Sequence, residues 1–220
     1  MFATTRAVSA GDELRRGDTT RTSDLVRSAQ VGVDQVSAQR DALAAQVESL
    51  QADAAQSDSG VASALDRVRD FEEAAGFVEV TGSGVRVTLT DAPRDSDGKY
   101  PVDAQPDDLV VHQQDVQSVL NAFWAGGATA VGMQDQRVVG TTAPRCIGNT
   151  LLLHGRTYSP PYVMTALGDP ARLEAALAAE PGVRTFKQYA VRYGLGYTET
   201  AGESLTVPAY NGQLRTRFAH

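Results

Sequence analysis

Apolar residues recur every three or four positions over a long stretch near the start of the chain. Between Thr22 and Phe71, twelve of the fifteen positions with this spacing are apolar, and the residues between them are mostly Gln, Asp, Ser, Arg and Glu. This heptad pattern is typical of a coiled coil or a helical hairpin. It predicts one helix from about Ser23 to Ala55, a break near Ser57–Gly60, and a second helix to about Ala75. The alternative is a long amphipathic helix folded back on the rest of the chain.

A second helical pattern lies near the middle of the chain. Its apolar stripe, with the spacing of one helix face, consists of Val116, Val119, Leu120, Phe123 and Trp124. Gly126-Gly127 ends this helix, because glycine readily adopts the left-handed conformation found at helix C-termini. Ala128 to Met133 then has the character of a strand. We therefore expect a helix packed on a sheet, with Trp124 mostly buried.

Short apolar or alternating runs predict further strands. They are Val85–Leu89, Arg137–Val139, Thr150–Leu153, Tyr158–Ala166, Tyr197–Thr200 and Leu205–Val207. The polar gap at Gln134-Asp135-Gln136 indicates a tight hairpin, and His154-Gly155 indicates a turn. Pro160-Pro161 has no N–H to donate, so it must lie at an edge, a bulge or a loop.

Two more helices complete the pattern. Asp169 and Pro170 mark a helix start as N-cap and first helical residue, and this helix runs to about residue 180. Val183 to Tyr193 predicts a third helix. The resulting order of strand, helix, strand, strand, helix, strand predicts an α+β fold of the ferredoxin-like type with a C-terminal decoration. We expect a four-stranded antiparallel sheet with the helices near 113–125 and 170–180 on one face.

The chain thus divides into a polar spacer at 1–21, a helical coiled-coil segment at 22–75 and an α+β domain at 76–220. The net charge is −7, and the acidic balance without basic clusters argues against a nucleic-acid partner. The one cysteine, Cys146, excludes an internal disulfide and a thiolate metal site, and we expect it to be a buried, small apolar residue.

No pattern of catalytic residues stands out, and we expect neither an enzyme, nor a cofactor, nor a metal site. His112 and His154 do not fall within a hydrolase or metalloprotease motif. Gly82-Ser83-Gly84 lacks the third glycine and the Lys-Ser/Thr pair of a phosphate loop. A hydrolase therefore remains only a remote alternative.

Five polar or aromatic residues are candidates for binding a ligand or a partner. Asp115, Asn121 and Arg137 either line one pocket for a small ligand or fix the helix and hairpin by hydrogen bonds. Tyr158 and Tyr162, with the two prolines between them, form either a surface that receives a peptide or a rigid cap on an edge strand.

Two long segments of this chain closely resemble the family called domain of unknown function 881. They are HQQDVQSVLNAFWAGGATAVGMQDQRV and TTAPRCIGNTLLLHGRTYSPPYVMTALGDP, and the resemblance continues upstream at Gly82–Leu89 and downstream at Tyr193–Tyr197. It covers roughly Phe71 to the end. The Gln134-Asp135-Gln136 sequence departs from the Asn-Gly or Asn-Asp turn expected there, which affects the type of hairpin and not the family.

The resemblance implies a membrane-anchored, extracytoplasmic envelope protein of actinobacteria or firmicutes, often encoded near cell-division genes, and it supplies no catalytic residues. Phe2-Ala3 resembles the end of a membrane helix, so we expect an anchor that is missing from this chain; a natural soluble paralogue is the alternative. The expected function is that of a scaffold in the envelope, linked to cell division or wall assembly. Its expected partners are envelope or division proteins, or a second copy paired through residues 22–75. A small-ligand-sensing module is the second hypothesis.

Overall fold

The computed structural model describes residues 13–94, 97–101, 103–148 and 150–212, with side chains from residue 28 onward except residue 30. This part of the chain begins with two helices, α2 (Glu13–Ser57) and α3 (Ser59–Ala75). Asp58 separates them, and its Oδ1 accepts the N–H groups of Gly60 at 2.7 Å and Val61 at 3.3 Å as the N-cap of α3. The predicted pair of helices with a break is confirmed, although α2 begins well before Thr22. The expectation concerning Phe2-Ala3 lies outside the described residues.

The chain divides into two compact units, with the division between Arg67 and Val68. In the first unit, large apolar side chains of α2 are exposed by 43% to 67%: Val33, Val36, Leu43, Val47 and Leu50. None of the described helices combines the length and the apolar character needed to cross a membrane.

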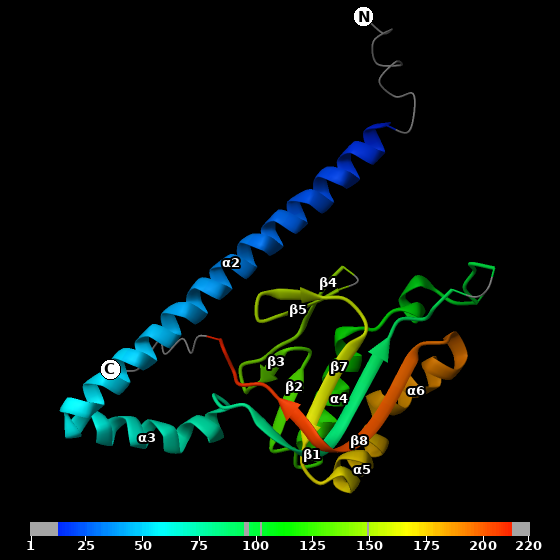
Figure 1. Cartoon of the computed structure of the whole chain (residues 1–220). Helices are drawn as coiled ribbons and strands as arrows, with labels where there is room; N and C mark the ends of the chain where they lie inside the picture. Colours follow the sequence, from blue (N-terminus) through cyan, green and yellow to red (C-terminus); the bar gives the residue numbers. More distant parts are fainter. Residues whose placement is uncertain (1–12, 95–96, 102, 149, 213–220) are drawn as a thin grey trace, which may run out of the picture. The chain divides into compact units, whose positions relative to one another are not determined.

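The second unit is built on a five-stranded antiparallel sheet with the order β3-β2-β7-β1-β8 (Figure 1). The strands are β1 (Val80–Thr90), β2 (Ala130–Met133), β3 (Gln136–Val138), β7 (Tyr162–Leu167) and β8 (Gly196–Val207). The α+β class and the antiparallel sheet are confirmed, but the sheet has five strands where the sequence predicted four. The two short terminal strands predicted are one continuous strand, β8. Its central residues face solvent on a sheet edge, so they carry no apolar alternation that would reveal them.

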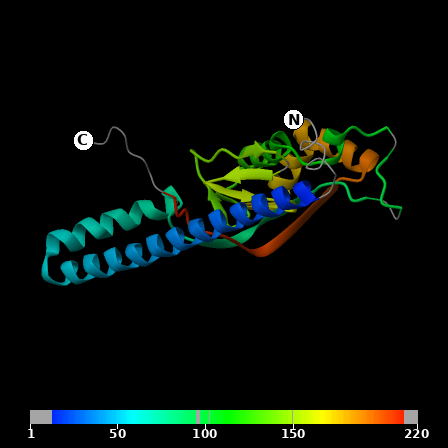
Figure 2. The same ribbon diagram turned by 90° about the horizontal axis from the view of Figure 1, so that it is seen from above.

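Helices α4 (Gln113–Ala125), α5 (Pro170–Ala179) and α6 (Pro181–Tyr193) cover one face of this sheet, as predicted for the first two (Figures 1 and 2). The start of α5 is the predicted one, because Asp169 Oδ1 accepts the Ala171 N–H at 3.0 Å. The main core lies between the helices and the inward side chains of the strands, including Val85, Phe123 and Met164.

Trp124 is 44% exposed, so the prediction that it would be mostly buried is wrong. At about 100° per residue, position 124 lies roughly 80° around the helix from Val116, at the margin of the stripe. Val116, Val119, Leu120 and Phe123 occupy the centre of the stripe and are buried.

A second, three-stranded sheet is inserted between β3 and β7. It consists of β4 (Arg145–Ile147), β5 (Thr150–Leu153) and β6 (Arg156–Tyr158), in the order β4-β5-β6. His154 and Gly155 turn the chain between β5 and β6, both with positive φ. Pro160-Pro161 is a loop with a cis peptide bond that separates β6 from β7, so the predicted strand Tyr158–Ala166 is two strands.

The hairpin between β2 and β3 turns at Gln134 and Asp135. Gln134 has a φ of 56°, a left-handed conformation that is uncommon for a residue with a side chain. Its side chain supports the turn from outside: Oε1 accepts the Val163 N–H at 3.1 Å and Nε2 donates to the Pro161 carbonyl at 3.1 Å. The hairpin thus closes without the glycine that such turns favour.

Candidate functional site

Arg137 lies on β3 and is the most deeply buried charged residue among those that the structure describes, with 6% of its surface exposed. Its neighbour Val138 joins the core beneath α4, so the side chain of Arg137 lies on the opposite face of the sheet. There its Nη1 donates to the carbonyls of Val78 at 3.2 Å and Pro208 at 3.4 Å. Arg137 therefore joins the segment that precedes β1 to the segment that follows β8.

These two segments also bind each other directly. The Tyr210 N–H donates to the Gly76 carbonyl at 2.7 Å, and the rings of Phe77 and Tyr210 meet edge to face with centroids 5.8 Å apart. The ring of His154 packs on Tyr210 from the inserted sheet at 5.4 Å. The C-terminal end of α3 is thereby fixed to the sheet by backbone and aromatic contacts around Arg137.

The positive charge of Arg137 has no carboxylate partner among the described residues. Burial lowers the pKa of its guanidinium, but an arginine starts so high that it remains charged. Nε and Nη2 make no hydrogen bond with the described residues, among which no fully buried side-chain nitrogen lacks a partner. These donors therefore keep access to the space beside Arg137.

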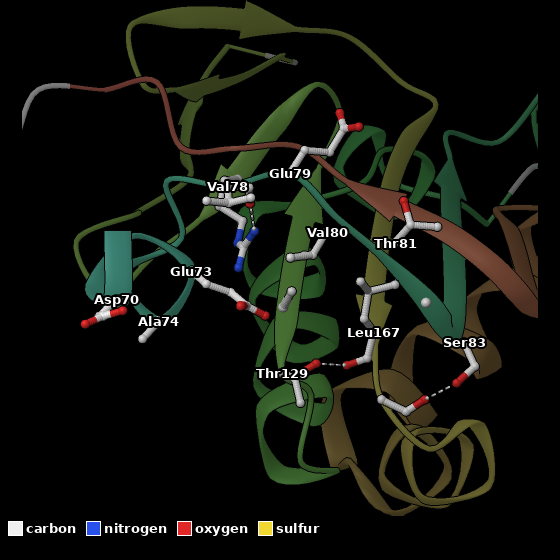
Figure 3. A pocket seen from close by; sticks show the side chains of 14 residues that line it. Asp70, Glu73, Ala74, Val78, Glu79, Val80, Thr81, Ser83, Thr129 and Leu167 are labelled. Atoms are coloured by element: carbon white, nitrogen blue, oxygen red, sulfur yellow. Dashed lines mark hydrogen bonds between the residues drawn. The ribbon is translucent and has the colours of Figure 1, made fainter. Parts of the chain in front are cut away.

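That space is a pocket of about 840 Å³ between the end of α3 and the uncovered face of the sheet (Figure 3). Its apolar lining comes from Val80, Ala130 and Leu167, and hydroxyl groups come from Thr81, Ser83 and Thr129. Acidic residues stand on its rim: Asp70, Glu73 and Glu79. The volume lies within the range of about 300–1,000 Å³ typical of small-molecule sites.

Asp115 belongs to a different cavity, on the helical side of the unit. Its Oδ2 accepts the His112 N–H at 2.8 Å and so caps α4, and burial raises the pKa of its carboxyl group. The cavity beside it measures about 220 Å³ and is also lined by Asp107, Phe186 and Tyr189.

Asn121 is exposed on α4, where its Oδ1 accepts the Gln117 amide at 2.9 Å. The structure therefore does not bring Asp115, Asn121 and Arg137 into one pocket. Asp115 and Asn121 make local hydrogen bonds on α4, and Arg137 binds two distant backbone segments. Structural hydrogen bonding of this kind was the other alternative that the sequence left open.

Tyr158 and Tyr162 lie at successive strand ends but in different environments. Tyr162 is fully buried, and its hydroxyl donates to the Tyr158 carbonyl at 3.3 Å, so its ring belongs to the core rather than to a surface. The Tyr158 hydroxyl donates to Asp135, to which Arg156 is also paired at 2.9 Å. Burial and the Asp135 carboxylate raise the pKa of Tyr158 to about 12.

Cys146 is exposed on β4, so the prediction of a buried, small apolar residue is wrong. Its Sγ accepts the Gln113 N–H at 3.3 Å, at the start of α4. In the described part of the chain, no group of three or more His, Cys, Asp or Glu residues is placed to hold a metal ion.

Sequence reasoning missed the pocket residues apart from Arg137. In the sequence, Glu73 resembles many other solvated acidic residues on a helix, and Thr129 resembles an ordinary residue at the start of a strand. Neither has a local pattern that reveals a neighbour far away in the chain. The signal that singled out Arg137 was a polar residue within the core pattern of the sequence.

Comparisons with known proteins agree with this fold. The model of the family described as "Bacterial protein of unknown function (DUF881)" matches residues 67–220. A UPF0749 protein of Mycobacterium tuberculosis is 27% identical over 188 residues, which cover 84% of this chain and 61% of that protein. The UPF0749 protein YlxW of Bacillus subtilis is 29% identical over 119 residues, 54% of this chain and 49% of that protein. The chain thus spans less than two thirds of the length of these relatives.

One solved structure has a similar fold. It is the crystal structure of an uncharacterized conserved protein from Mycobacterium tuberculosis, with a TM-score of 0.53 and 24% sequence identity. The match covers 70% of this chain and 98% of that one.

Proposed function

Since the chain belongs to the bacterial DUF881 family, we propose that it is a non-enzymatic interaction protein of the cell envelope, in which α2 pairs with a second helix and the α+β unit binds a partner. The exposed apolar seam of α2 carries this proposal. A helix of 45 residues that shows five large apolar side chains to solvent on one heptad stripe has a surface suited to another helix.

The residue types along this seam favour a second copy of the chain as the partner. Val33 and Val47 occupy the first core position of the heptad, and Leu43 and Leu50 the second, a combination that favours parallel two-stranded coils. Asp53 is the one charged residue at the positions that flank this seam, and the others are Ser37, Gln39, Ala44, Gln46 and Gln51. No pattern of charges therefore selects an unlike chain.

Arg40 interrupts the seam at a first core position. Its Nη2 is paired with Asp41 Oδ1 at 2.6 Å, which partly offsets its charge. A charged residue in a coiled-coil seam lowers stability while it fixes the register. We therefore expect weak, parallel self-association that strengthens when a membrane concentrates the chains.

Sedimentation equilibrium of the chain and of Arg40→Leu tests this expectation. The variant should dimerise about tenfold more tightly or better, because it removes a desolvated charge and adds apolar seam. Ala38→Leu is the matched control, since it adds a leucine on the face of α2 opposite the seam and should leave the association constant unchanged. If all three proteins remain monomeric up to millimolar concentration, self-pairing through the seam is wrong.

The extracytoplasmic location, the membrane anchor and the link to cell division or wall assembly are further parts of the proposal. They are supported by the family resemblance, and the acidic charge of the chain fits a protein without a nucleic-acid partner. The strand order β8-β1-β7-β2, with helices between β1 and β2 and between β7 and β8, supports a ferredoxin-like description of the central fold.

A small-ligand-sensing module is the second candidate function. The pocket beside Arg137 favours this function. The buried guanidinium of Arg137 has N–H donors that are not used by the protein, and the volume of the pocket suits a small molecule.

A further inference from the structure

The pocket at the end of α3 contains a buried cation whose hydrogen-bonding capacity is only partly used. The two carbonyls that bind Arg137 both accept hydrogen bonds from Nη1, so Nε and Nη2 remain available as donors. A buried charge without a counter-ion is costly, and a guanidinium binds carboxylates through two parallel N–H groups. The group that best completes this site is therefore a carboxylate supplied by a ligand.

The rim of the pocket excludes a simple anion. Three carboxylates line the pocket against one guanidinium, so the local charge is negative. Figure 3 shows the side chain of Glu73 directed into the pocket, while that of Glu79 is directed away from it. A ligand that brings a carboxylate to Arg137 must also bring a positive charge that Glu73 can meet.

We infer that this pocket binds a small zwitterion with a carboxylate at one end and an ammonium group at the other. The carboxylate accepts the free N–H groups of Arg137, and the ammonium group pairs with Glu73. The apolar floor of Val80, Ala130 and Leu167 takes the carbon chain between the two charges. This inference does not depend on the pairing of α2.

The position of the site links ligand binding to the attachment of α3. Arg137 binds the backbone of Val78, three residues after α3 ends at Ala75, so a ligand that also meets Glu73 would bridge the sheet and the end of that helix. Binding would thus reinforce the attachment of α3 to the sheet by mass action on the folded form.

A ladder of ω-amino acids tests the chemistry and the spacing together. Glycine, 4-aminobutyrate and 6-aminohexanoate carry both charges at increasing separation, whereas hexanoate and hexylammonium carry one each. Titrations followed by NMR chemical shifts should show one amino acid binding at least about tenfold more tightly than either single-charge probe. If no probe binds at tens of millimolar, or if hexanoate binds as tightly as the best amino acid, the inference is wrong.

Glu73→Gln and Glu79→Gln form a matched pair of variants for this titration. Both residues are exposed and line the pocket, so both variants should fold, and each removes one negative charge. Glu73→Gln should reduce the affinity for the best amino acid to that for hexanoate, and Glu79→Gln should change it less than twofold. Equal weakening by both would show a diffuse electrostatic effect and would overturn the assignment of Glu73.

Arg137→Lys tests the other end of the site. It keeps a positive charge but removes the two-pronged donor, so it should weaken, without abolishing, the binding of ligands with a carboxylate. Thermal unfolding of the free variant shows whether it folds; if it does not, the Glu73 and Glu79 variants still decide the inference.

Discussion

His154 is the residue at which the inserted sheet, the hairpin and the C-terminal segment meet. Its Nε2 is hydrogen-bonded to Thr142 Oγ1 at 2.9 Å, its Nδ1 lies 3.4 Å from Gln136 Oε1, and its ring packs against Tyr210. Burial lowers the pKa of this histidine below its usual value of 6.5. The neutral ring is therefore the form that the folded chain favours.

The lowered pKa of His154 predicts a loss of stability in mild acid. His154 takes up a proton near pH 6.5 in the unfolded chain and only at lower pH in the folded chain. The contribution of His154 to the stability of the fold is therefore complete above pH 6.5, and it is lost as the pH falls through the folded pKa. Urea unfolding at pH 7, 6 and 5 should show a smaller decline for His154→Gln than for the unchanged protein. Identical declines would contradict a role for this histidine.

At the residue scale, the sequence reveals groups that act locally and hides groups that act at a distance. Asp169 was predictable as a helix cap because its partner lies two residues away at Ala171. Arg137 was recognisable as unusual, but its partners at Val78 and Pro208 are 59 and 71 residues away. Nothing in the sequence near 137 identifies them, since they are backbone carbonyls.

At the scale of the element, β1 is the strand that holds the large sheet together, because it pairs with both β7 and β8. Its register with β8 shifts between Gly82 and Gly84. A side chain at Gly84 would collide with the carbonyl oxygen of Ala166 and approach the Leu167 Cα to 2.9 Å, both on β7. Backbone atoms within a sheet cannot move aside as the end of a flexible side chain can.

Gly84→Ala should therefore destabilise the protein by about 3 kcal/mol or more, because the strand has to separate from β7 to admit the methyl group. Gly82→Ala is the matched control on the same strand, since a Cβ there meets no atom within 4 Å. The control should change the free energy of unfolding in urea by less than about 1 kcal/mol. Similar losses for both variants would mean that close packing against β7 is not the constraint.

Long periodic elements were predictable from the sequence, and short ones were not. The break between α2 and α3 was visible as a cluster of polar residues and glycine, and the turn at His154-Gly155 was visible between two apolar runs. By contrast, β4 has three exposed residues and no alternation, so its pairing with β5 follows from tertiary structure alone. The edge strand β8 was seen only at its two ends for the same reason.

At the scale of the whole molecule, the two compact units carry different kinds of surface. The first presents the apolar seam of α2, and the second presents an open pocket lined in part by the buried Arg137. A seam of this kind suits lasting contact with another chain, whereas the pocket suits a small ligand. An envelope scaffold that responds to a ligand would use both surfaces.

The proposed extracytoplasmic location can be tested on the whole natural protein through Cys146. This residue is exposed, and it is the one cysteine in the sequence of this chain, so labelling by a membrane-impermeant maleimide reports where the α+β unit resides. Intact cells should be labelled to the same extent as lysed cells, because the reagent reaches an external thiol without crossing the membrane. Cys146→Ser is the control and should remove the signal from this chain. Labelling that requires lysis would place the unit inside the cell and contradict the envelope proposal, while leaving the predicted pairing of α2 open to its own test by sedimentation.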